Sequence, residues 1–265
     1  MLKIKISIFY FLLIFSSCDS GKKEDDTKIM LPGKETEMRD LINKYPDSII
    51  LRETLIQYYR ENGDYENALS ETNNAIKKAE HDPRLYDIQA ILNFENGDTL
   101  KSIASFEKAI SIYPNPEYII SLGTLYAQTK NAKAIKLADA LIKQDKINAE
   151  KEALFIKGLY YSYLNDKEKA INFFDKIIRL NFTFMDAYRE KAIALYDLGK
   201  YAEALLVIDK AVTLQNNFDE GYYYKGRILE KLNRVEEARV AYERALLYDP
   251  GYIEAKNALA RLKIN

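Results

Sequence analysis

Residues 219–252 read DEGYYYKGRILEKLNRVEEARVAYERALLYDPGY, and small residues stand in this stretch at fixed intervals. Ala238 follows Gly226 after twelve residues, Ala245 follows after seven more, and Pro250 after five more. Moving this frame towards the amino terminus by multiples of thirty-four residues finds small residues again at Ala204, Ala170, Ser102 and Ala68. A fixed period of this length is typical of a solenoid built from stacked helical hairpins.

Each period holds two amphipathic helical patterns joined by a turn, and the small residues fall where the two helices would cross. A large side chain at that crossing would push the backbones apart, whereas glycine or alanine lets the bulky residues around it interlock. We therefore predict an all-α solenoid of about six helix hairpins, with a capping helix at each end.

The pattern resembles the tetratricopeptide repeat, whose scheme is W-x2-L-G-x2-Y…A-x3-F…P. The resemblance covers about residues 49–252 and implies a right-handed superhelix whose first helices line a concave groove. In this family the groove usually holds an extended peptide or a helix of a partner protein. The residues that match the scheme in the last repeat are Tyr222 at the Trp place, Gly226, Leu229 at the Tyr place, Ala238, Tyr242 at the Phe place, Ala245 and Pro250.

The composition fits a soluble or repeat protein. The chain has 265 residues, 48% hydrophobic and 30% charged, which is enough for a large buried core. Its 39 basic and 40 acidic residues give a net charge of −1. Because nucleic-acid-binding proteins usually show a basic excess, no nucleic-acid partner is predicted. One cysteine and one histidine cannot form a disulfide framework or a Cys/His metal cluster, and no cofactor is predicted.

The first residues have the pattern of a secretory signal peptide. Two lysines precede an apolar run, residues 6–15, that is too short to span a bilayer as a mature helix. Residues 15–18, Phe-Ser-Ser-Cys, resemble a bacterial lipoprotein cleavage box. This resemblance implies removal of residues 1–17 and lipidation of Cys18, which would anchor the protein to a membrane. The alternatives are an ordinary signal peptide with an incidental cysteine, and an uncleaved anchor.

Residues 18–33 are predicted to form the lipidated cysteine and a polar tether. The charged run at residues 22–26 resembles the export tag of some surface lipoproteins, and a plain solvated linker explains it equally well. Asp19 resembles an inner-membrane retention signal of some bacteria. The predicted location is the bacterial cell envelope, with the outer membrane preferred, on its periplasmic or surface face, and the choice of membrane left open.

The period divides the rest of the chain into a cap, six repeats and a second cap. Residues 34–48 hold an amphipathic helix that ends before Pro46, and residues 253–265 form a final helix whose polar outer face keeps the solenoid soluble. The six predicted repeats are 49–82, 83–116, 117–150, 151–184, 185–218 and 219–252.

The third repeat departs from the period. Its small residue, Ala134, comes one position early, so the turn at Lys130-Asn131 is predicted to be one residue short. Extra residues near Asn148 restore the frame. We expect a local change in helix packing here; a bend of the solenoid is one outcome, and a harmless loop variation is the simpler one.

The resemblance also implies which side chains line the groove. They combine apolar and aromatic residues with scattered arginines, a composition common at interfaces. A tyrosine in a helical repeat is more often part of the core than a contact, so each assignment keeps a core alternative. The residues predicted to bind a partner are Phe94, Phe155, Tyr163, Arg189, Tyr196, Tyr223 and Arg227.

Signals for an enzyme are weak. His81 stands alone between two repeats, and the chain has no Gly-rich phosphate loop or nucleophile elbow. Some tetratricopeptide domains hold the terminal carboxylate of a partner with a clamp of Lys, Asn and Arg side chains. This chain does not match that clamp, since Glu53 and Gln57 stand at two of its places. We therefore predict a non-enzymatic scaffold that binds a protein or peptide in the envelope. The alternative is a glycan-binding surface lipoprotein, which the absence of tryptophan disfavours.

Overall fold

The computed structural model describes residues 33–144 and 146–264, and within these ranges the chain forms fourteen α-helices and no strand. This architecture confirms the predicted all-α solenoid of hairpins. In chain order the helices are α1 (Lys34–Lys44), α2 (Ile49–Glu61), α3 (Tyr65–Lys78), α4 (Pro83–Glu95), α5 (Thr99–Ile112), α6 (Pro116–Gln128), α7 (Lys133–Gln144), α8 (Lys146–Tyr163), α9 (Lys167–Leu180), α10 (Met185–Asp197), α11 (Tyr201–Leu214), α12 (Asp219–Lys231), α13 (Val235–Tyr248) and α14 (Ile253–Ile264).

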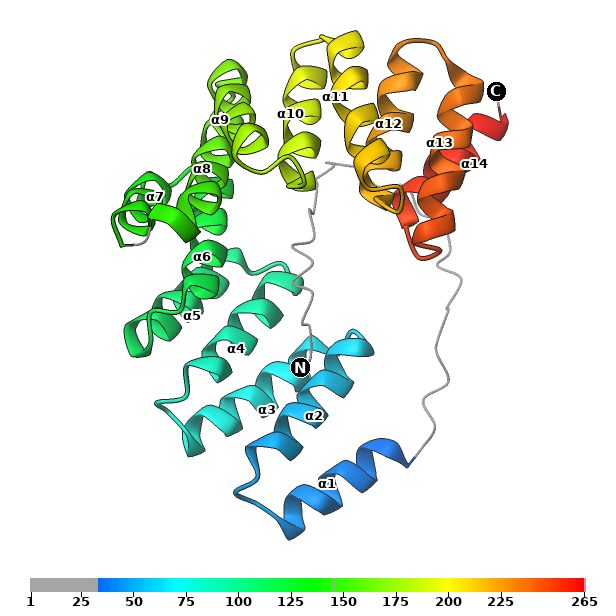
Figure 1. Ribbon diagram of the computed structural model, residues 1–265. Helices are drawn as coiled ribbons and strands as arrows, with labels where there is room; N and C mark the ends of the chain where they lie inside the picture. The colour runs from blue at the N-terminus through cyan, green and yellow to red at the C-terminus, as the bar shows by residue number, and fades with distance from the viewer. Residues whose placement is uncertain (1–32, 145, 265) are drawn as a thin grey trace.

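The helices follow one another as pairs along an arch (Figure 1). Each helix packs on the helix before it and on the helix after it, so contacts run mainly between neighbours in sequence. Helix α1 packs on α2 at one end, and α14 packs on α13 at the other. We call α2, α4, α6, α8, α10 and α12 the first helices, and their partners α3, α5, α7, α9, α11 and α13 the second helices.

The turns inside the hairpins share one three-residue arrangement. A residue in the left-handed region follows the end of the first helix, and the next residue caps the second helix. Three of the six left-handed positions hold glycine, among them Gly63 and Gly97, and the other three hold Lys130, Asn165 and Asn233. Where aspartate is the cap, as at Asp64, its carboxylate accepts a hydrogen bond from a free N–H of the first turn.

Glycine brings the two helices of a hairpin close together. A Cβ atom added to Gly226 would lie 2.5 Å from Cε1 of Tyr242, and one added to Gly158 would lie 2.6 Å from Cε1 of Phe174. Both rings are fully buried, so the aromatic side chain of the second helix fills the space that glycine leaves on the first. In these two hairpins the small residue at the crossing therefore has the packing role predicted for it.

The third hairpin corrects the prediction of a shortened turn. The three turn positions of the other hairpins are kept as residues 129–131, with Lys130 in the left-handed region and the Asn131 side chain accepting a hydrogen bond from the N–H of Lys133, and Ala132 follows before α7 begins. The missing residue belongs to the start of α7 instead. There the N–H of Ala134 donates to the carbonyl three residues earlier, at 3.0 Å, whereas Ala170 at the matching place in α9 donates to the carbonyl four residues earlier. Helix α6 also begins at Pro116, ahead of the predicted boundary at 117.

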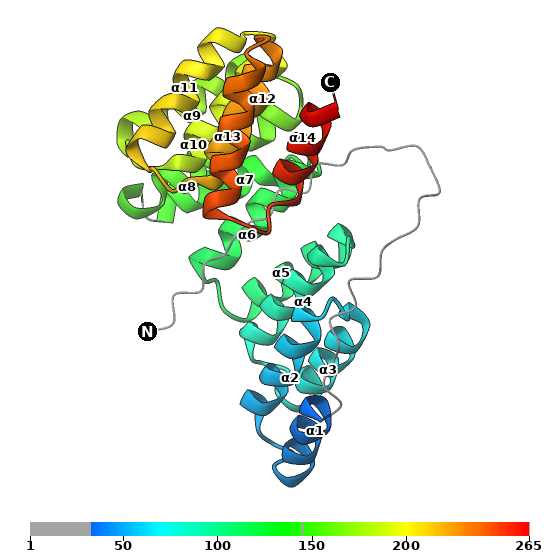
Figure 2. The same cartoon turned by 90° about the vertical axis from the view of Figure 1, so that its right-hand side faces the viewer.

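Packing changes around this hairpin, as the irregular period predicted. Helix α6 packs on α8 as well as on α7. A Cβ atom on Gly123 would lie 2.5 Å from Cδ1 of Ile156 in α8, so this glycine faces the next repeat rather than its own second helix. Helix α8 begins at Lys146 and has 18 residues, starting ahead of the predicted boundary at 151. Figure 2 shows α1–α5 and α7–α14 as two groups set at an angle, with α6 where they meet.

Candidate partner-binding face

Side chains of neighbouring first helices meet along one surface, which we call the first-helix face. Arg84 of α4 lies 3.6 Å from Glu53 of α2. The side chain of Gln128 in α6 is hydrogen-bonded to Tyr163 of α8. The guanidinium carbon of Arg227 in α12 lies 5.1 Å from the ring centre of Tyr196 in α10. The residues that define the face are Glu53, Gln57, Arg84, Asp87, Phe94, Glu117, Gln128, Tyr163, Tyr196, Tyr223 and Arg227.

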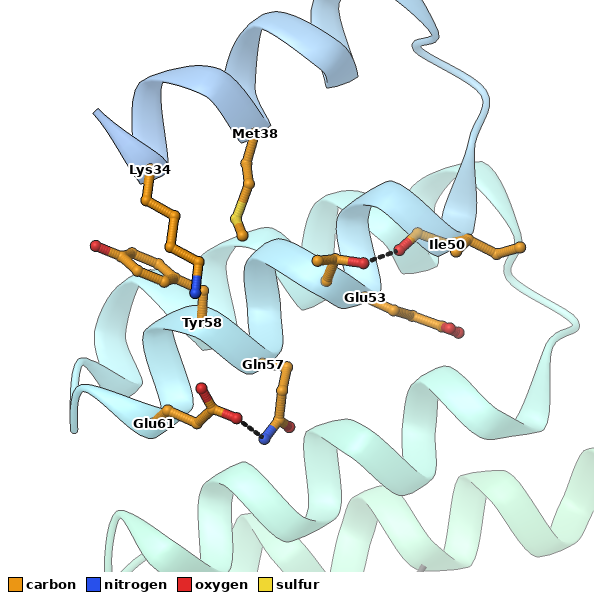
Figure 3. A pocket seen from close by; sticks show the side chains of 8 residues that line it. Lys34, Met38, Ile50, Glu53, Gln57, Tyr58 and Glu61 are labelled. Carbon is orange, nitrogen blue, oxygen red and sulfur yellow. Dashed lines mark hydrogen bonds between the residues drawn. The ribbon is translucent and has the colours of Figure 1, made fainter. Parts of the chain in front are cut away.

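At the amino-terminal end of this face, α1 and α2 form an open hollow of about 380 Å³ (Figure 3). Within it, Gln57 donates to Glu61 at 3.0 Å, and the Lys34 ammonium lies 5.4 Å from the ring centre of Tyr58. The sequence did not predict this hollow because two of its eight lining residues, Lys34 and Met38, come from the cap α1, which lies outside the repeats. The lining residues are Lys34, Met38, Ile50, Glu53, Thr54, Gln57, Tyr58 and Glu61.

The middle of the first-helix face is acidic. Asp87 is half-buried and forms no hydrogen bond or ion pair with the residues that the structure describes. Burial, reinforced by the negative charge of Glu117, raises the pKa of Asp87 to about 6. Two buried oxygen atoms of the next first helices, Oγ1 of Thr124 in α6 and Oε2 of Glu152 in α8, also lack a hydrogen-bond partner within the described ranges. This stretch therefore has unused hydrogen-bonding capacity.

Tyr163 provides a phenol hydroxyl where α8 meets the end of α6. Its ring is half-buried in α8, and burial, with the charge of Glu190, raises its pKa to about 12. The hydroxyl therefore stays protonated at neutral pH and keeps a hydrogen bond with Gln128. Tyr163 thus joins two first helices and presents a polar tip on an apolar ring.

The carboxyl-terminal end of the face is aromatic and basic. Tyr196, Tyr223 and Arg227 are half-buried. The guanidinium carbon of Arg227 lies 5.1 Å from the ring centre of Tyr196, 5.9 Å from that of Tyr223 and 5.6 Å from that of Tyr224. These distances fit cation–π contacts, which hold the planar guanidinium in place. On its other side Tyr223 packs on Tyr252, with ring centres 5.0 Å apart.

The structure places five of the seven predicted contact residues on this face: Phe94, Tyr163, Tyr196, Tyr223 and Arg227 are all half-buried. Phe155 is different, because it is 7% exposed and its ring packs 6.0 Å from Phe174 and 5.4 Å from Phe184, centre to centre. Its ring belongs to the core, which was the alternative kept for it.

Arg189 is also buried, at 4% exposure. Its guanidinium forms ion pairs with Asp186 at 2.8 Å, with Glu190 at 3.1 Å and with Glu220 of the next repeat. These carboxylates occupy the arginine, so its observed role is to join α10 to α12. The sequence holds one signal for this pairing: Arg189 and Glu220 are 31 residues apart, the same separation as between Glu53 and Arg84.

Cys18 and the tether lie outside the described residues. Among the helices of the described ranges, none combines the length and the apolar character needed to cross a bilayer. His81 lies on an exposed loop between α3 and α4, where its Nε2 is 3.5 Å from a carboxylate oxygen of Glu80.

Models of the tetratricopeptide repeat match residues 54–115, 151–184 and 219–252. The chain therefore contains tetratricopeptide repeats, as predicted from its period. Repeats of this kind indicate a scaffold for protein–protein interaction, and proteins built from them are generally not catalysts.

Two curated relatives come from Methanocaldococcus jannaschii. The TPR repeat-containing protein MJ1428 is 29% identical over 155 residues, which cover 54% of this chain and 27% of that protein. The uncharacterized protein MJ0572 is 43% identical over 53 residues, which cover 20% of this chain and 62% of that protein. The chain thus spans about a quarter of the length of the first relative and less than two thirds of the second.

Solved structures of repeat proteins resemble the whole fold. A tetratricopeptide repeat protein from Parabacteroides merdae superposes with a TM-score of 0.71 at 20% identity, covering 87% of this chain and 91% of that one. TTC0263, a thermophilic TPR protein in Thermus thermophilus, superposes with a TM-score of 0.59 at 15% identity, covering 69% of this chain and 100% of that one. At these identities the similarity shows the fold alone.

Proposed function

We propose that this tetratricopeptide-repeat protein is a lipid-anchored scaffold of the bacterial cell envelope that holds a segment of a partner protein along its first-helix face. The main support is the run of half-buried aromatic and charged side chains that continues from one first helix to the next. Tyrosine and arginine in such settings are common anchors of protein interfaces. The envelope and the anchor rest on the signal-like residues 1–17 and on Cys18.

The face suits a segment that lies across several helices. Tyr163, Tyr196 and Tyr223 offer apolar ring surface and a hydroxyl each, which suits a backbone with mixed side chains. Asp87 and Glu117 lie at the acidic middle and Arg227 at the basic end, so the charges along the face differ from one end to the other. A partner would therefore be held in one direction.

Affinity capture tests the scaffold function. The full chain, anchored through Cys18, is used to recover partners from membranes of the organism that encodes it. We expect a specific protein to be recovered, and we expect its recovery to fall at least tenfold with Tyr196→Ala combined with Tyr223→Ala. Leu206→Ala combined with Val240→Ala is the matched control, since both residues are exposed on second helices. Retention on a polysaccharide column with no protein recovered would contradict the proposal and favour glycan binding.

The anchor has its own test. Cells that produce the full chain are grown with radiolabelled palmitate, and the protein is then isolated and counted. We expect label in the wild type and none in Cys18→Ala, because the proposed lipid is carried by the sulfur and the new amino terminus of Cys18. Label that persists in Cys18→Ala, or a wild type without label, would contradict the anchor and leave the repeat scaffold in place.

A further inference from the structure

Arg227 is half-buried on the first-helix face without a carboxylate partner. No Asp or Glu of the described residues forms an ion pair with it, and its contacts are the rings of Tyr196, Tyr223 and Tyr224. Its one hydrogen-bond partner is the Tyr196 side chain. Removing a cation from water without an anion nearby costs free energy, and cation–π contacts offset only part of that cost.

Other arginines of the described ranges behave differently. Arg179 and Arg244 also lack a carboxylate, but both are exposed to solvent. The arginines that pair with Asp or Glu are Arg39, Arg52, Arg60, Arg84, Arg189, Arg234, Arg239 and Arg261. Within this part of the chain, Arg227 thus combines burial with the lack of an anion.

Both glutamates of α12, the helix that carries Arg227, are already engaged. Glu220 is held by Arg189, and Glu230 is held by Arg261 at 2.7 Å and accepts a hydrogen bond from the Tyr242 hydroxyl. Moving either carboxylate to Arg227 would leave another arginine unpaired. Neither glutamate of α12 can therefore complete this site without breaking an ion pair that it already forms.

We propose that Arg227 receives a carboxylate of the bound partner, from an Asp or Glu side chain of a peptide segment that passes over the rings of Tyr196 and Tyr223. This inference rests on the proposed scaffold function and adds the chemistry of the ligand. The guanidinium presents N–H donors in a fixed planar fork that matches both carboxylate oxygens. The flanking rings exclude water and hold the fork in place, so the ion pair forms in a partly dry setting, where it is stronger than at an open surface.

A peptide selection tests this proposal. A phage-displayed library of random dodecapeptides is panned against purified residues 19–265, which lack the predicted signal peptide and Cys18. The captured peptides are sequenced and then synthesised, and their affinities are measured for the wild type, Arg227→Gln, Arg227→Lys and Arg244→Gln. Arg244 is the matched control because its guanidinium also lies over a tyrosine ring, 5.6 Å from the ring centre of Tyr222, but on a second helix. Circular dichroism melting checks that each variant is folded.

We expect captured peptides to be enriched in Asp or Glu at one position. We also expect Arg227→Gln to bind at least tenfold more weakly, Arg227→Lys to be intermediate, and Arg244→Gln to bind like the wild type. Peptides without acidic enrichment, or peptides that bind folded Arg227→Gln as tightly as the wild type, would overturn the carboxylate site while leaving the scaffold function standing. Failure to capture any peptide would count against both.

Discussion

At the scale of single residues, the unpaired carboxylate of Asp87 on the first-helix face lowers the free energy of unfolding. Its pKa rises from 3.8 to about 6 on folding, so the folded state binds more protons than the unfolded state between these pH values. The free energy of unfolding should therefore fall as the pH rises through this window and stay lower above it. The unpaired carboxylate lies on the proposed partner-binding face, where it could accept a hydrogen bond from a bound partner.

Asp87→Asn removes this cost. We expect the variant to be more stable than the wild type at pH 7 by about 1 kcal/mol, since each pKa unit corresponds to about 1.4 kcal/mol and solvent reduces the effect at a half-buried site. The difference should shrink towards pH 4, where the wild-type carboxyl is largely protonated. Urea unfolding at pH 4, 5, 6 and 7 measures this, with Glu243→Gln on an exposed helix face as control. A less stable Asp87→Asn at pH 7 would show that the carboxylate has a favourable partner.

Gly226 tests the packing of the hairpins. On helix propensity alone, Gly226→Ala would stabilise α12 by up to about 1 kcal/mol. The added Cβ would instead lie 2.5, 2.7 and 2.8 Å from three ring atoms of Tyr242, which is fully buried and whose hydroxyl is bonded to Glu230. We expect a net loss of about 1–3 kcal/mol in the free energy of unfolding, measured by urea denaturation.

A second variant identifies the cause. Tyr242→Ile combined with Gly226→Ala recreates the Ala192 and Ile208 pair that repeat five has at the same places, both fully buried. The two changes together should cost less than the sum of the single changes, because the clash is removed. If Gly226→Ala matched or exceeded the wild type in stability, the close approach of α12 and α13 would be refuted.

At the residue scale, the sequence could place side chains on a helix but could not tell which would be occupied by neighbours. Phe94, Tyr196 and Arg227 lie half-buried on the first-helix face. Arg189 stands at the same place of its repeat as Tyr223, yet Glu220 of the following repeat forms an ion pair with it, so its guanidinium is already engaged. Such pairing depends on how two neighbouring repeats stack on each other. The sequence of a single repeat carries no information about this stacking.

At the scale of elements, the turns offer a clean comparison of glycine with other residues. Lys130 has a φ of 57°, a region that costs a residue with a Cβ about 1 kcal/mol. We expect Lys130→Gly to raise the free energy of unfolding by up to about 1 kcal/mol. Gly97→Ala should do the reverse, because Gly97 has a φ of 82° and nothing within 4 Å of an added Cβ, so only backbone strain changes. Thermal melting of both variants checks the pair; opposite signs from those expected would contradict the turn geometry.

The hairpins themselves could be predicted because each has its own amphipathic period and a turn residue. The start of α7 could not be predicted in the same way. The spacing between Gly123 and Ala134 shows that one residue is missing, but it does not show at which position. The structure keeps the turn, whose left-handed residue and cap need all three positions, and shortens the first turn of α7. The early start of α8 at Lys146 follows from its packing on both α6 and α7.

At the scale of the whole molecule, contacts run mainly between neighbouring helices, so stability should be transmitted over short distances. Gly226→Ala should speed amide hydrogen exchange in α10–α14 and leave α1–α4 at wild-type rates. Gly123→Ala, at the contact of α6 with α8, should affect α6–α9 most, since its Cβ would meet Ile156. Exchange measured by mass spectrometry separates these regions. A uniform increase along the chain in both variants would show one cooperative unit instead.

The angle between α1–α5 and α7–α14 lies at the third repeat, where the sequence left a bend and a simple loop variation as alternatives (Figure 2). The period shows where regular stacking is interrupted, but the direction of the change depends on how α6 lies against α8. The first-helix face still crosses this junction, because Gln128 of α6 and Tyr163 of α8 stay hydrogen-bonded there.

The most direct test of the account is to locate a bound peptide by photo-crosslinking. A captured peptide carrying a benzophenone group is irradiated on the full chain, and the crosslinked residues are identified by mass spectrometry. We expect crosslinks on first helices, at Tyr163, Tyr196 or Tyr223 and their neighbours. Crosslinks confined to the exposed residues of second helices, such as Leu206, Val240 or Leu247, would contradict a partner held on the first-helix face.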